Sequence, residues 1–350
     1  FVYKFVSSKM NLKVIKKNKE LQGFVEIIKI MTEEVSSKLK ETNIFIDEYL
    51  NSHQEIIPEM GNYFFSGRGK QLRPLLCLYS SKMINKDYNE IKSDIYMASA
   101  LEFIHSATLL HDDVIDSGLE RRGKKSVNAI WGNKHSILLG DYMFSKSFKL
   151  MTKSNSLKAM MSLADVSAKI SEGEFLQLTN ENNIDLSIQT YLNIIRSKTG
   201  ELFSASFKIP AILTNKSDEM IEELHILGMN FGIIFQILDD LLDYHGSKET
   251  GKTIGQDFYD GKISLPIILL IQISDKETYQ FLKTIFSLKQ RTSKQLDKVI
   301  LLLKENNIDK EIKKHLEIYI NRSKKILSNF NNKESENLKK LITSSVNRYY

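Results

Sequence analysis

The sequence predicts an all-α fold in one large helical domain. Only 4 of the 350 residues are proline and only 16 are glycine, so residues that break helices and form turns are scarce. Neither type occurs after Pro266, whereas a β-sandwich needs a turn signal roughly every 8–12 residues. No segment rich in serine, glycine and proline divides the chain, and the hydrophobic share of 42% can supply one sizeable core.

The first 20 residues are set apart by their charge. Six lysines and no acidic residue occur within residues 1–19. This bias predicts a flexible basic arm or the remnant of an organelle-targeting segment over residues 1–20. Residues 21–350 are expected to form the helical domain.

The helices expected along this domain follow from apolar periodicity and from capping signals. Segments 95–110 and 224–242 lack a continuous polar face, which predicts two helices buried on all sides. Further on, Ser274 to Glu277 and Thr292 to Gln295 have the pattern of capping boxes. Asp309 precedes an apolar stripe with helical spacing. These patterns predict amphipathic helices in the last quarter of the chain.

Composition limits the partners and the compartment. The formal net charge is +6, but lysine and glutamate are interspersed without a basic stripe between aromatic residues, so no nucleic acid is expected. The single cysteine, Cys77, cannot form an internal disulfide. This favours an intracellular, reducing location, either the cytoplasm or an organelle such as the mitochondrion. No run of about 18 apolar residues occurs, so no transmembrane segment is expected.

Both predicted buried helices end in an acidic cluster of the form DDxxD. The first cluster contains Asp112, Asp113 and Asp116, and the second contains Asp239, Asp240 and Asp243. Residues at i and i+4 share one face of a helix, so the first and last aspartates of each cluster repel unless a cation lies between them. Oxygen ligands without cysteine or clustered histidine predict Mg²⁺ as this cation.

Basic residues follow each acidic cluster. Arg121 and Arg122 come after the first cluster, and Lys252 and Lys262 come after the second. A helix end that faces solvent would explain one DDxxD, but it does not explain two copies that are both accompanied by cations. Carboxylates for a metal ion and cations for phosphate oxygens indicate a site for a diphosphate bridged by Mg²⁺.

A basic loop at residues 67–74 precedes both clusters. It contains Lys70 and Arg73 beside two glycines, which let the backbone approach an anion closely. This composition is typical of a phosphate clamp. The alternative is an ordinary basic loop that places Pro74 in the first turn of a helix, where proline is tolerated.

Together, these motifs resemble the trans-isoprenyl diphosphate synthases, the polyprenyl synthetase family, from about residue 61 to the last helices. The ordered set is GKQLRP at 69–74, EFIH at 102–105, LHDDVID at 110–116, RR at 121–122, GD at 140–141, GE at 173–174, KTG at 198–200, FQILDDLLD at 235–243, GK at 251–252 and GK at 261–262. The resemblance implies an isoprenoid synthase fold, with residues 21–350 as the catalytic domain around a deep central cavity. It also implies a homodimer.

The resemblance implies a role for each motif. Mg²⁺ would be bound by Asp112, Asp116 and Asp239, with support from Asp113, Asp240 and Asp243. Isopentenyl diphosphate would be held by Lys70, Arg73, His105 and Arg122, and the diphosphate of the allylic primer by Arg121, Lys198, Lys252 and Lys262. Thr199 and Gln236 would present oxygen dipoles to the allylic cation. Gln71 departs from the family pattern because it replaces a frequent arginine in the loop that holds isopentenyl diphosphate.

The implied reaction joins isopentenyl diphosphate head-to-tail to an allylic diphosphate primer. In this family a bulky side chain shortly before the first aspartate stops chain growth early. The residue there is Ala107, with Thr108 beside it. The shaft for the growing chain is therefore expected to be open down to a floor near Phe148 or Met151. The expected product is a long-chain all-trans polyprenyl diphosphate of roughly octaprenyl class.

Several other functions share part of this pattern. A shorter-chain farnesyl or geranylgeranyl diphosphate synthase has the same motifs, and a non-catalytic subunit of a heteromeric prenyl synthase has the same fold. The second alternative is disfavoured because both acidic clusters are complete. A class I terpene cyclase usually lacks the second DDxxD and the clamp residues Lys70 and Arg73. A metal phosphohydrolase with a His-Asp doublet needs more histidine ligands than this sequence places together.

Overall fold

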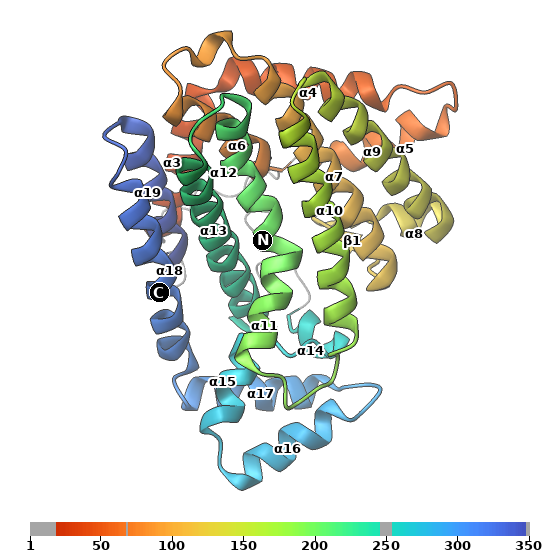
Figure 1. Ribbon diagram of the computed structural model, residues 1–350. Helices are drawn as coiled ribbons and strands as arrows, with labels where there is room; N and C mark the ends of the chain where they lie inside the picture. Colours follow the sequence, from red (N-terminus) through yellow and green to blue (C-terminus); the bar gives the residue numbers. More distant parts are fainter. Residues whose placement is uncertain (1–18, 68, 246–253, 348–350) are drawn as a thin grey trace.

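The computed structural model describes residues 19–67, 69–245 and 254–347, which are almost entirely helical (Figure 1). The helices up to the first acidic cluster are α3 (Lys19–Glu34), α4 (Ser36–Leu50), α5 (Ile56–Phe65), α6 (Leu72–Ile84), the 3₁₀ turn η1 (Tyr88–Glu90) and α7 (Ser93–Ile115). A hairpin of β1 (Glu120–Arg121) and β2 (Lys124–Lys125) follows, and then come α8 (Val127–Trp131), α9 (Asn133–Lys153), α10 (Leu157–Leu178), α11 (Ile188–Ile195) and the π-helical turn η2 (Arg196–Gly200). The remaining helices are α12 (Glu201–Leu213), α13 (Asp218–His245), α14 (Gln256–Asp260), α15 (Leu265–Ile273), α16 (Lys276–Phe286), α17 (Ser293–Glu305), α18 (Ile308–Leu327) and α19 (Lys333–Asn347). The predicted all-α class is confirmed.

The core lies where α6, α7, α12 and α13 pack against one another. The two segments predicted to be buried, 95–110 and 224–242, fall inside α7 and α13, and most of their apolar side chains are buried. Close approach of α13 to its neighbours depends on glycine. A Cβ atom on Gly232 would lie 2.7 Å from the Cα atom of Gly200, and one on Gly228 would lie 2.6 Å from the Cα atom of Ser204. Both distances are shorter than real contacts allow, so α13 packs backbone against backbone.

Figure 1 shows how the chain is distributed around this core. Helices α18 and α19 lie on the left, α5, α8 and α9 lie on the right, and α15, α16 and α17 form the lower end. Helices α7 and α13 run from the upper part of the molecule toward the lower part, where α14 lies. The acidic clusters occupy the C-terminal ends of α7 and α13, so the fold brings both clusters to the same end.

The helices of the last quarter have the predicted amphipathic character. The predicted capping box of α17 is present, with Thr292 and Gln295 in reciprocal bonds. The prediction for α16 is wrong by one residue, because Asp275 rather than Ser274 accepts the hydrogen bond from the Thr278 backbone N–H. The stripe after Asp309 is buried in α18 at Ile312, Leu316, Tyr319 and Ser323.

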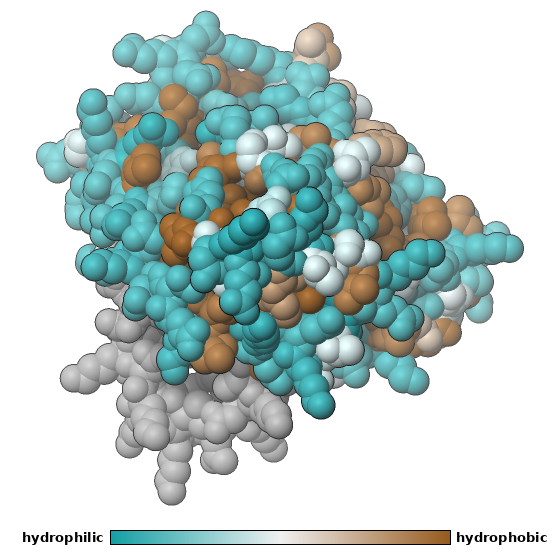
Figure 2. Space-filling view, turned by 90° about the horizontal axis from the view of Figure 1, so that it is seen from below, coloured by the Kyte–Doolittle hydropathy of each residue, from teal (hydrophilic) through white to brown (hydrophobic). Residues whose placement is uncertain are grey.

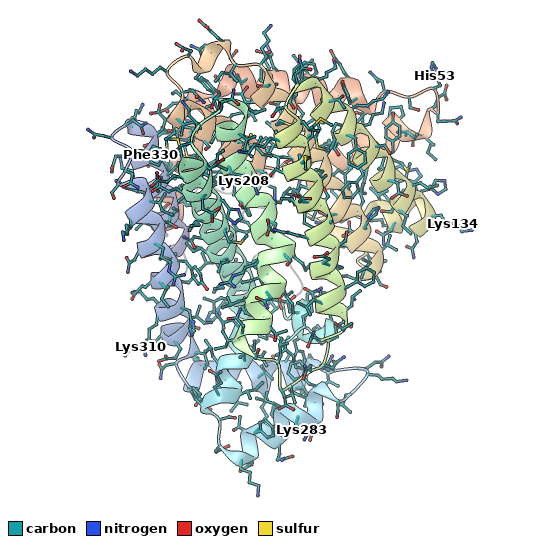
Figure 3. The ribbon with its side chains drawn as sticks, in the orientation of Figure 1. His53, Lys134, Lys208, Lys283, Lys310 and Phe330 are labelled. Atoms are coloured by element: carbon teal, nitrogen blue, oxygen red, sulfur yellow. The ribbon has the colours of Figure 1, made fainter. Side chains whose placement is uncertain are left out.

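The surface is mostly hydrophilic. Seen from below, hydrophobic residues occur in separate patches between hydrophilic ones (Figure 2). Lys134, Lys283 and Lys310 project outward from the periphery (Figure 3). Among the described residues, α13 is the one helix that is long and apolar enough to cross a membrane, but 56% of that window is buried inside the protein. A core helix passes the same test, and α13 is such a helix.

A buried ion pair joins α4 to α7. Lys38 Nζ lies 2.8 Å from Asp94 Oδ2 and also donates to the carbonyl oxygens of Tyr88 and Ile91. The side chains are only 6% and 0% exposed. Ser81 completes the site by donating to Asp94. All the donors of the ammonium group therefore have partners, and the charge on Asp94 is compensated.

Replacing Lys38 by methionine is expected to lower the free energy of unfolding by about 3–5 kcal/mol. The reason is that the change leaves the Asp94 carboxylate buried without its cation. Urea denaturation measures the loss. The control is Lys29→Met, because the Lys29–Glu33 pair is 76% and 65% exposed and such pairs contribute little. Equal, small effects in both variants would contradict the prediction.

Candidate active site

The first acidic cluster closes the C-terminal end of α7. Asp112 and Asp116 lie one turn apart, and Asp116 is the C-cap residue. The pKa of Asp112 is raised to about 6, chiefly by burial: Glu174 and Asp116 also raise it, whereas the cations of Lys198 and Arg121 lower it. These two cations therefore do not fully compensate the carboxylate charge. A divalent cation would supply the remaining positive charge and keep Asp112 ionised.

Asp113 has a different environment from its two neighbours. It is buried, and each of its carboxylate oxygens accepts a hydrogen bond of 2.7 Å from Arg121. This bidentate pair fixes the guanidinium beside the first cluster. Asp113 therefore supports the site by orienting Arg121.

The β1–β2 hairpin places the next basic residue. Arg122 and Gly123 have φ angles of 54° and 76°, as a two-residue hairpin turn requires. Arg122 donates a 2.9 Å hydrogen bond to the carbonyl oxygen of Gly67. The hairpin is thereby attached to the loop that leads to Lys70 and Arg73, so the predicted basic residues are brought to one region.

Arg73 and His105 are in direct contact. Arg73 Nη1 lies 3.0 Å from His105 Nε2, and its guanidinium stacks over the Phe203 ring at 4.4 Å. Burial and the cations of Arg73, Arg122 and Arg121 lower the pKa of His105 well below its usual value. The imidazole is therefore neutral and accepts the hydrogen bond from Arg73. Lys70 lies over the Phe24 ring at 4.9 Å.

The loop before α6 is held by the residue that departs from the family pattern. Gln71 has a left-handed backbone, with φ 45°, and its amide donates a 2.8 Å hydrogen bond to Asn43 Oδ1 on α4. The side chain is buried. Gln71 thus anchors the loop and does not extend toward solvent.

The second acidic cluster lies at the end of α13, and its members have separate partners. Asp240 is buried and accepts hydrogen bonds from Tyr191 and Gln236, of 2.6 and 2.8 Å. Asp243 accepts from the backbone N–H groups of Gln256 and Asp257, at 3.1 and 2.9 Å. Asp243 therefore fixes the start of α14, and its predicted part in metal binding stays a prediction.

Lys262 joins the first cluster to the segment held by Asp243, because its backbone N–H donates to the Asp257 carbonyl at 2.8 Å and the Asp257 N–H donates to Asp243. Its ammonium group lies 3.0 Å from Asp116 Oδ2 and 3.3 Å from Asp260 Oδ2. Burial alone would lower the pKa of Lys262, but the surrounding carboxylates, Asp116 first, raise it well above its usual value. The lysine stays charged, and it is a cation already placed beside the first cluster.

Lys198 and Thr199 lie in the π-helical turn η2. Lys198 forms an ion pair with Glu174 of α10, and Thr199 donates a 2.7 Å hydrogen bond to Gln236 Oε1. The approach of α10 to this turn requires Gly173, because a Cβ atom there would lie 2.6 Å from Ser197 Cβ. This contact explains the GE motif at 173–174. The wide turn presents Lys198 and Thr199 on the side of the acidic clusters.

The chain-length residues lie two turns or less before the first cluster. Ala107 is completely buried, and the hydroxyl of Thr108 donates to the His105 carbonyl. Of the two predicted floor residues, Met151 is buried, but Phe148 is 50% exposed on α9. Phe148 is thus exposed in the single chain. The part that Phe148 or Met151 plays in the floor of a shaft stays a prediction.

The aspartate carboxylates of the two clusters suit a metal ion whose coordination shell is completed by the substrate. Among the described residues, no three acidic, histidine or cysteine side chains form a preformed metal site. Aspartate carboxylates near the C-terminal ends of α7 and α13 are the kind of ligand preferred by a hard cation such as Mg²⁺, which completes its shell with water and phosphate. Asp112, Asp116 and Asp239 would hold the cation. Lys252 lies outside the described residues.

Sequence reasoning missed the residues that hold the segment around α14. Arg291 donates to the carbonyl oxygen of Tyr259 at 3.1 Å and also to Asn182 Oδ1. Asn182 in turn donates its backbone N–H to the Gly261 carbonyl at 2.8 Å. Lys262 follows directly, so this junction sets its position. No local pattern marks Arg291 or Asn182, because their partners are distant in sequence.

Known proteins share these features. The polyprenyl synthetase family model matches residues 54–303. Octaprenyl diphosphate synthase of Escherichia coli (strain K12) is 38% identical over 243 residues, covering 69% of this chain and 74% of that protein. The crystal structure of a decaprenyl diphosphate synthase from Rhodobacter capsulatus superposes with a TM-score of 0.87 at 32% identity, covering 92% of this chain and 99% of the other. A polyprenyl synthase from Caulobacter crescentus CB15, complexed with calcium and isoprenyl diphosphate, gives 0.86 at 34% identity, covering 91% and 97%.

The helical fold and the paired acidic clusters thus match those of prenyltransferases. The chain belongs to the polyprenyl synthetase family. Its function is that of a polyprenyl diphosphate synthase, in a family that generally depends on divalent metal ions. The predicted family, fold and enzyme class are confirmed.

Proposed function

We propose that this protein is a Mg²⁺-dependent synthase that extends an allylic diphosphate primer with isopentenyl diphosphate to a long-chain all-trans product of roughly octaprenyl class. The observation that carries the proposal is the set of cations beside the first acidic cluster: Lys262 lies 3.0 Å from Asp116, and Arg121 is paired with Asp113. Asp243 of the second cluster binds the start of α14, which places the second cluster next to the segment that carries Lys262. This arrangement supports binding of a metal-bridged diphosphate.

In the proposed reaction, the C–O bond of the allylic diphosphate breaks, and its electron pair leaves with the diphosphate. Bound Mg²⁺ would supply positive charge to the departing group. Lys198 and Lys262 would stabilise the same oxygens, and Arg121 is held ready by Asp113. The double bond of isopentenyl diphosphate then forms the new C–C bond, and the released diphosphate takes the proton that is lost.

The two diphosphates would occupy different parts of the site. Lys70, Arg73 and Arg122 belong to the connected loop and hairpin, and we assign them to isopentenyl diphosphate. Arg121, Lys198 and Lys262 lie beside the acidic clusters and would hold the primer. Thr199 and Gln236 would direct oxygen atoms toward the allylic cation.

We also propose a homodimer formed through α9 and α10. Leu157, Met161 and Phe175 share one face of α10 and are more than half exposed, and Phe148 on the adjacent α9 is also exposed. Large exposed apolar patches are typical of protein interfaces. Sedimentation of the purified chain tests this part of the proposal.

Residues 21–350 would form the catalytic domain of each subunit, and the location would be intracellular.

The small side chain of Ala107 supports a long product rather than a short one. Farnesyl or geranylgeranyl length is the alternative, and geranylgeranyl diphosphate synthase of Geoglobus acetivorans is also a relative, at 34% identity over 68% of this chain. Incubation with labelled isopentenyl diphosphate, an allylic primer and Mg²⁺, followed by sizing of the product, decides between them. A product of about four isoprene units or fewer would contradict the long-chain proposal.

Separate substitutions are expected to distinguish the two substrate subsites. Lys70→Ala or Arg73→Ala should raise the KM for isopentenyl diphosphate about tenfold or more, because a charged contact is lost. Arg121→Ala should instead weaken the primer. Steady-state kinetics with each substrate varied in turn measures both effects, and Lys134→Ala on the periphery serves as the control (Figure 3). If Lys70→Ala impaired only primer binding, the assignment of the subsites would be reversed.

A further inference from the structure

A chain of three hydrogen bonds joins α11 to the π-helical turn through α13. The hydroxyl of Tyr191 donates to Asp240 Oδ2 at 2.6 Å, and Gln236 Nε2 donates to Asp240 Oδ1 at 2.8 Å. The Thr199 hydroxyl then donates to Gln236 Oε1 at 2.7 Å. Helices α11 and α13, which carry Tyr191 and Asp240, are in contact. Both approach the lower part of the molecule (Figure 1).

The chemistry of the groups fixes the direction of these bonds. A phenol that donates to one carboxylate oxygen leaves the other oxygen to accept from an amide N–H. The Gln236 amide must therefore turn its nitrogen toward Asp240 and its oxygen toward Thr199. The Thr199 hydroxyl donates its single proton to that oxygen. Its remaining lone pairs, like those of Gln236, are then available to a positive centre.

The first hydrogen bond of this series, from Tyr191 to Asp240, joins two deeply buried side chains. Tyr191 and Asp240 are 3% and 4% exposed, whereas Gln236 is partly exposed. Among the described residues, Tyr191 is the side chain that donates to Asp240 Oδ2. Without this donor, that oxygen is free to accept the amide N–H instead, and the Gln236 side chain can rotate away from Thr199. The phenol therefore restricts the amide to one orientation.

We propose that Tyr191 is a positioning residue for catalysis, which orients the oxygens of Gln236 and Thr199 through Asp240. The inference rests on the proposed role of these two residues at the allylic cation. Tyr191 makes its contact with Asp240 and acts on the reacting atoms only through that contact. Its effect belongs to the step in which the cation forms, because only then do oriented oxygen dipoles act on a full positive charge.

Tyr191→Phe removes the hydroxyl and keeps the ring. We expect kcat to fall about tenfold, while the KM values for primer and isopentenyl diphosphate change by less than about twofold, because the lost orientation matters in the transition state. The matched control is Tyr79→Phe. Tyr79 is buried on α6, donates a 2.9 Å hydrogen bond to Glu34 Oε2, and lies outside the site. Tyr79→Phe should leave kcat unchanged when both variants are assayed below their melting temperatures.

A double-mutant cycle separates positioning from a general loss of stability. If Tyr191 acts through Gln236, then Tyr191→Phe should have no further effect on kcat in a Gln236→Leu background. Additive losses in the two variants would overturn the inference. A Gln236→Leu enzyme with normal kcat would instead overturn the proposed role of Gln236 at the cation, which is a different failure. An equal loss of kcat in Tyr79→Phe would also overturn the inference, because it would indicate a nonspecific effect.

Discussion

Replacement of Asp112 or Asp239 by alanine is expected to lower turnover about a thousandfold or more at saturating Mg²⁺. Each change removes a proposed metal ligand, and Asp112→Ala also removes the carboxylate one turn before Asp116. Single-turnover assays with bound primer measure the loss in the chemical step. Asp297→Ala is the control, because Asp297 is exposed on α17 and belongs to neither cluster.

Asp112→Ala should differ from the unchanged enzyme in its response to pH. In the metal-free protein the pKa of Asp112 is raised to about 6, so protons compete with the metal below that pH. The wild-type enzyme should need more Mg²⁺ for half-maximal activity as pH falls through 6. Asp112→Ala cannot show this competition at residue 112. Near-normal turnover in either alanine variant would contradict a metal site built from both clusters.

The sequence predicted the parts of the site that depend on local periodicity. Helical spacing places Asp112 and Asp116 on one face, and burial on all sides of α7 and α13 follows from their apolar composition. The hairpin turn at Arg122 and Gly123 was not predicted, although it is equally local. These features arise within a few residues of chain, so a pattern in the sequence is sufficient to find them.

Other parts of the site arise only when distant segments meet. Asp243 follows the DDxxD pattern, yet it holds α14 because the chain returns there after a turn. Arg291 approaches Asn182 from more than a hundred residues away. Tyr191 is 49 residues from Asp240. No spacing rule connects these pairs, and their chemistry in isolation is that of common surface or core residues.

The sequence could not predict the exposure of the two proposed floor residues either. Phe148 and Met151 are three residues apart, so they lie on neighbouring parts of α9, but one is half exposed and the other is buried. The difference depends on which helices cover α9. Phe148 instead falls among the apolar side chains proposed to form the dimer interface.

Ala107→Phe is expected to shift the product to the farnesyl or geranylgeranyl range while the first condensation stays largely intact. Ala107 is on α7, just before the first cluster, so a growing chain that runs along α7 passes this side chain early. A phenyl ring there would force the chain to displace packed side chains, at a cost of about 1–3 kcal/mol for each step past it. Product release would then compete with further extension. Reversed-phase chromatography of the products of both enzymes measures the change in length.

The matched control is Ala98→Phe, on the opposite face of the same helix. Ala98 and Ala107 are both completely buried, and nine residues correspond to two and a half turns. Overpacking should destabilise the Ala98 variant without shortening its product. If Ala107 borders an open shaft, the phenylalanine ring introduced at position 107 can enter that space. Ala107→Phe should then lower the melting temperature less than Ala98→Phe does. Unchanged product length in Ala107→Phe would mean that the chain does not pass this residue, and equal losses of stability would mean that the space beside it is filled.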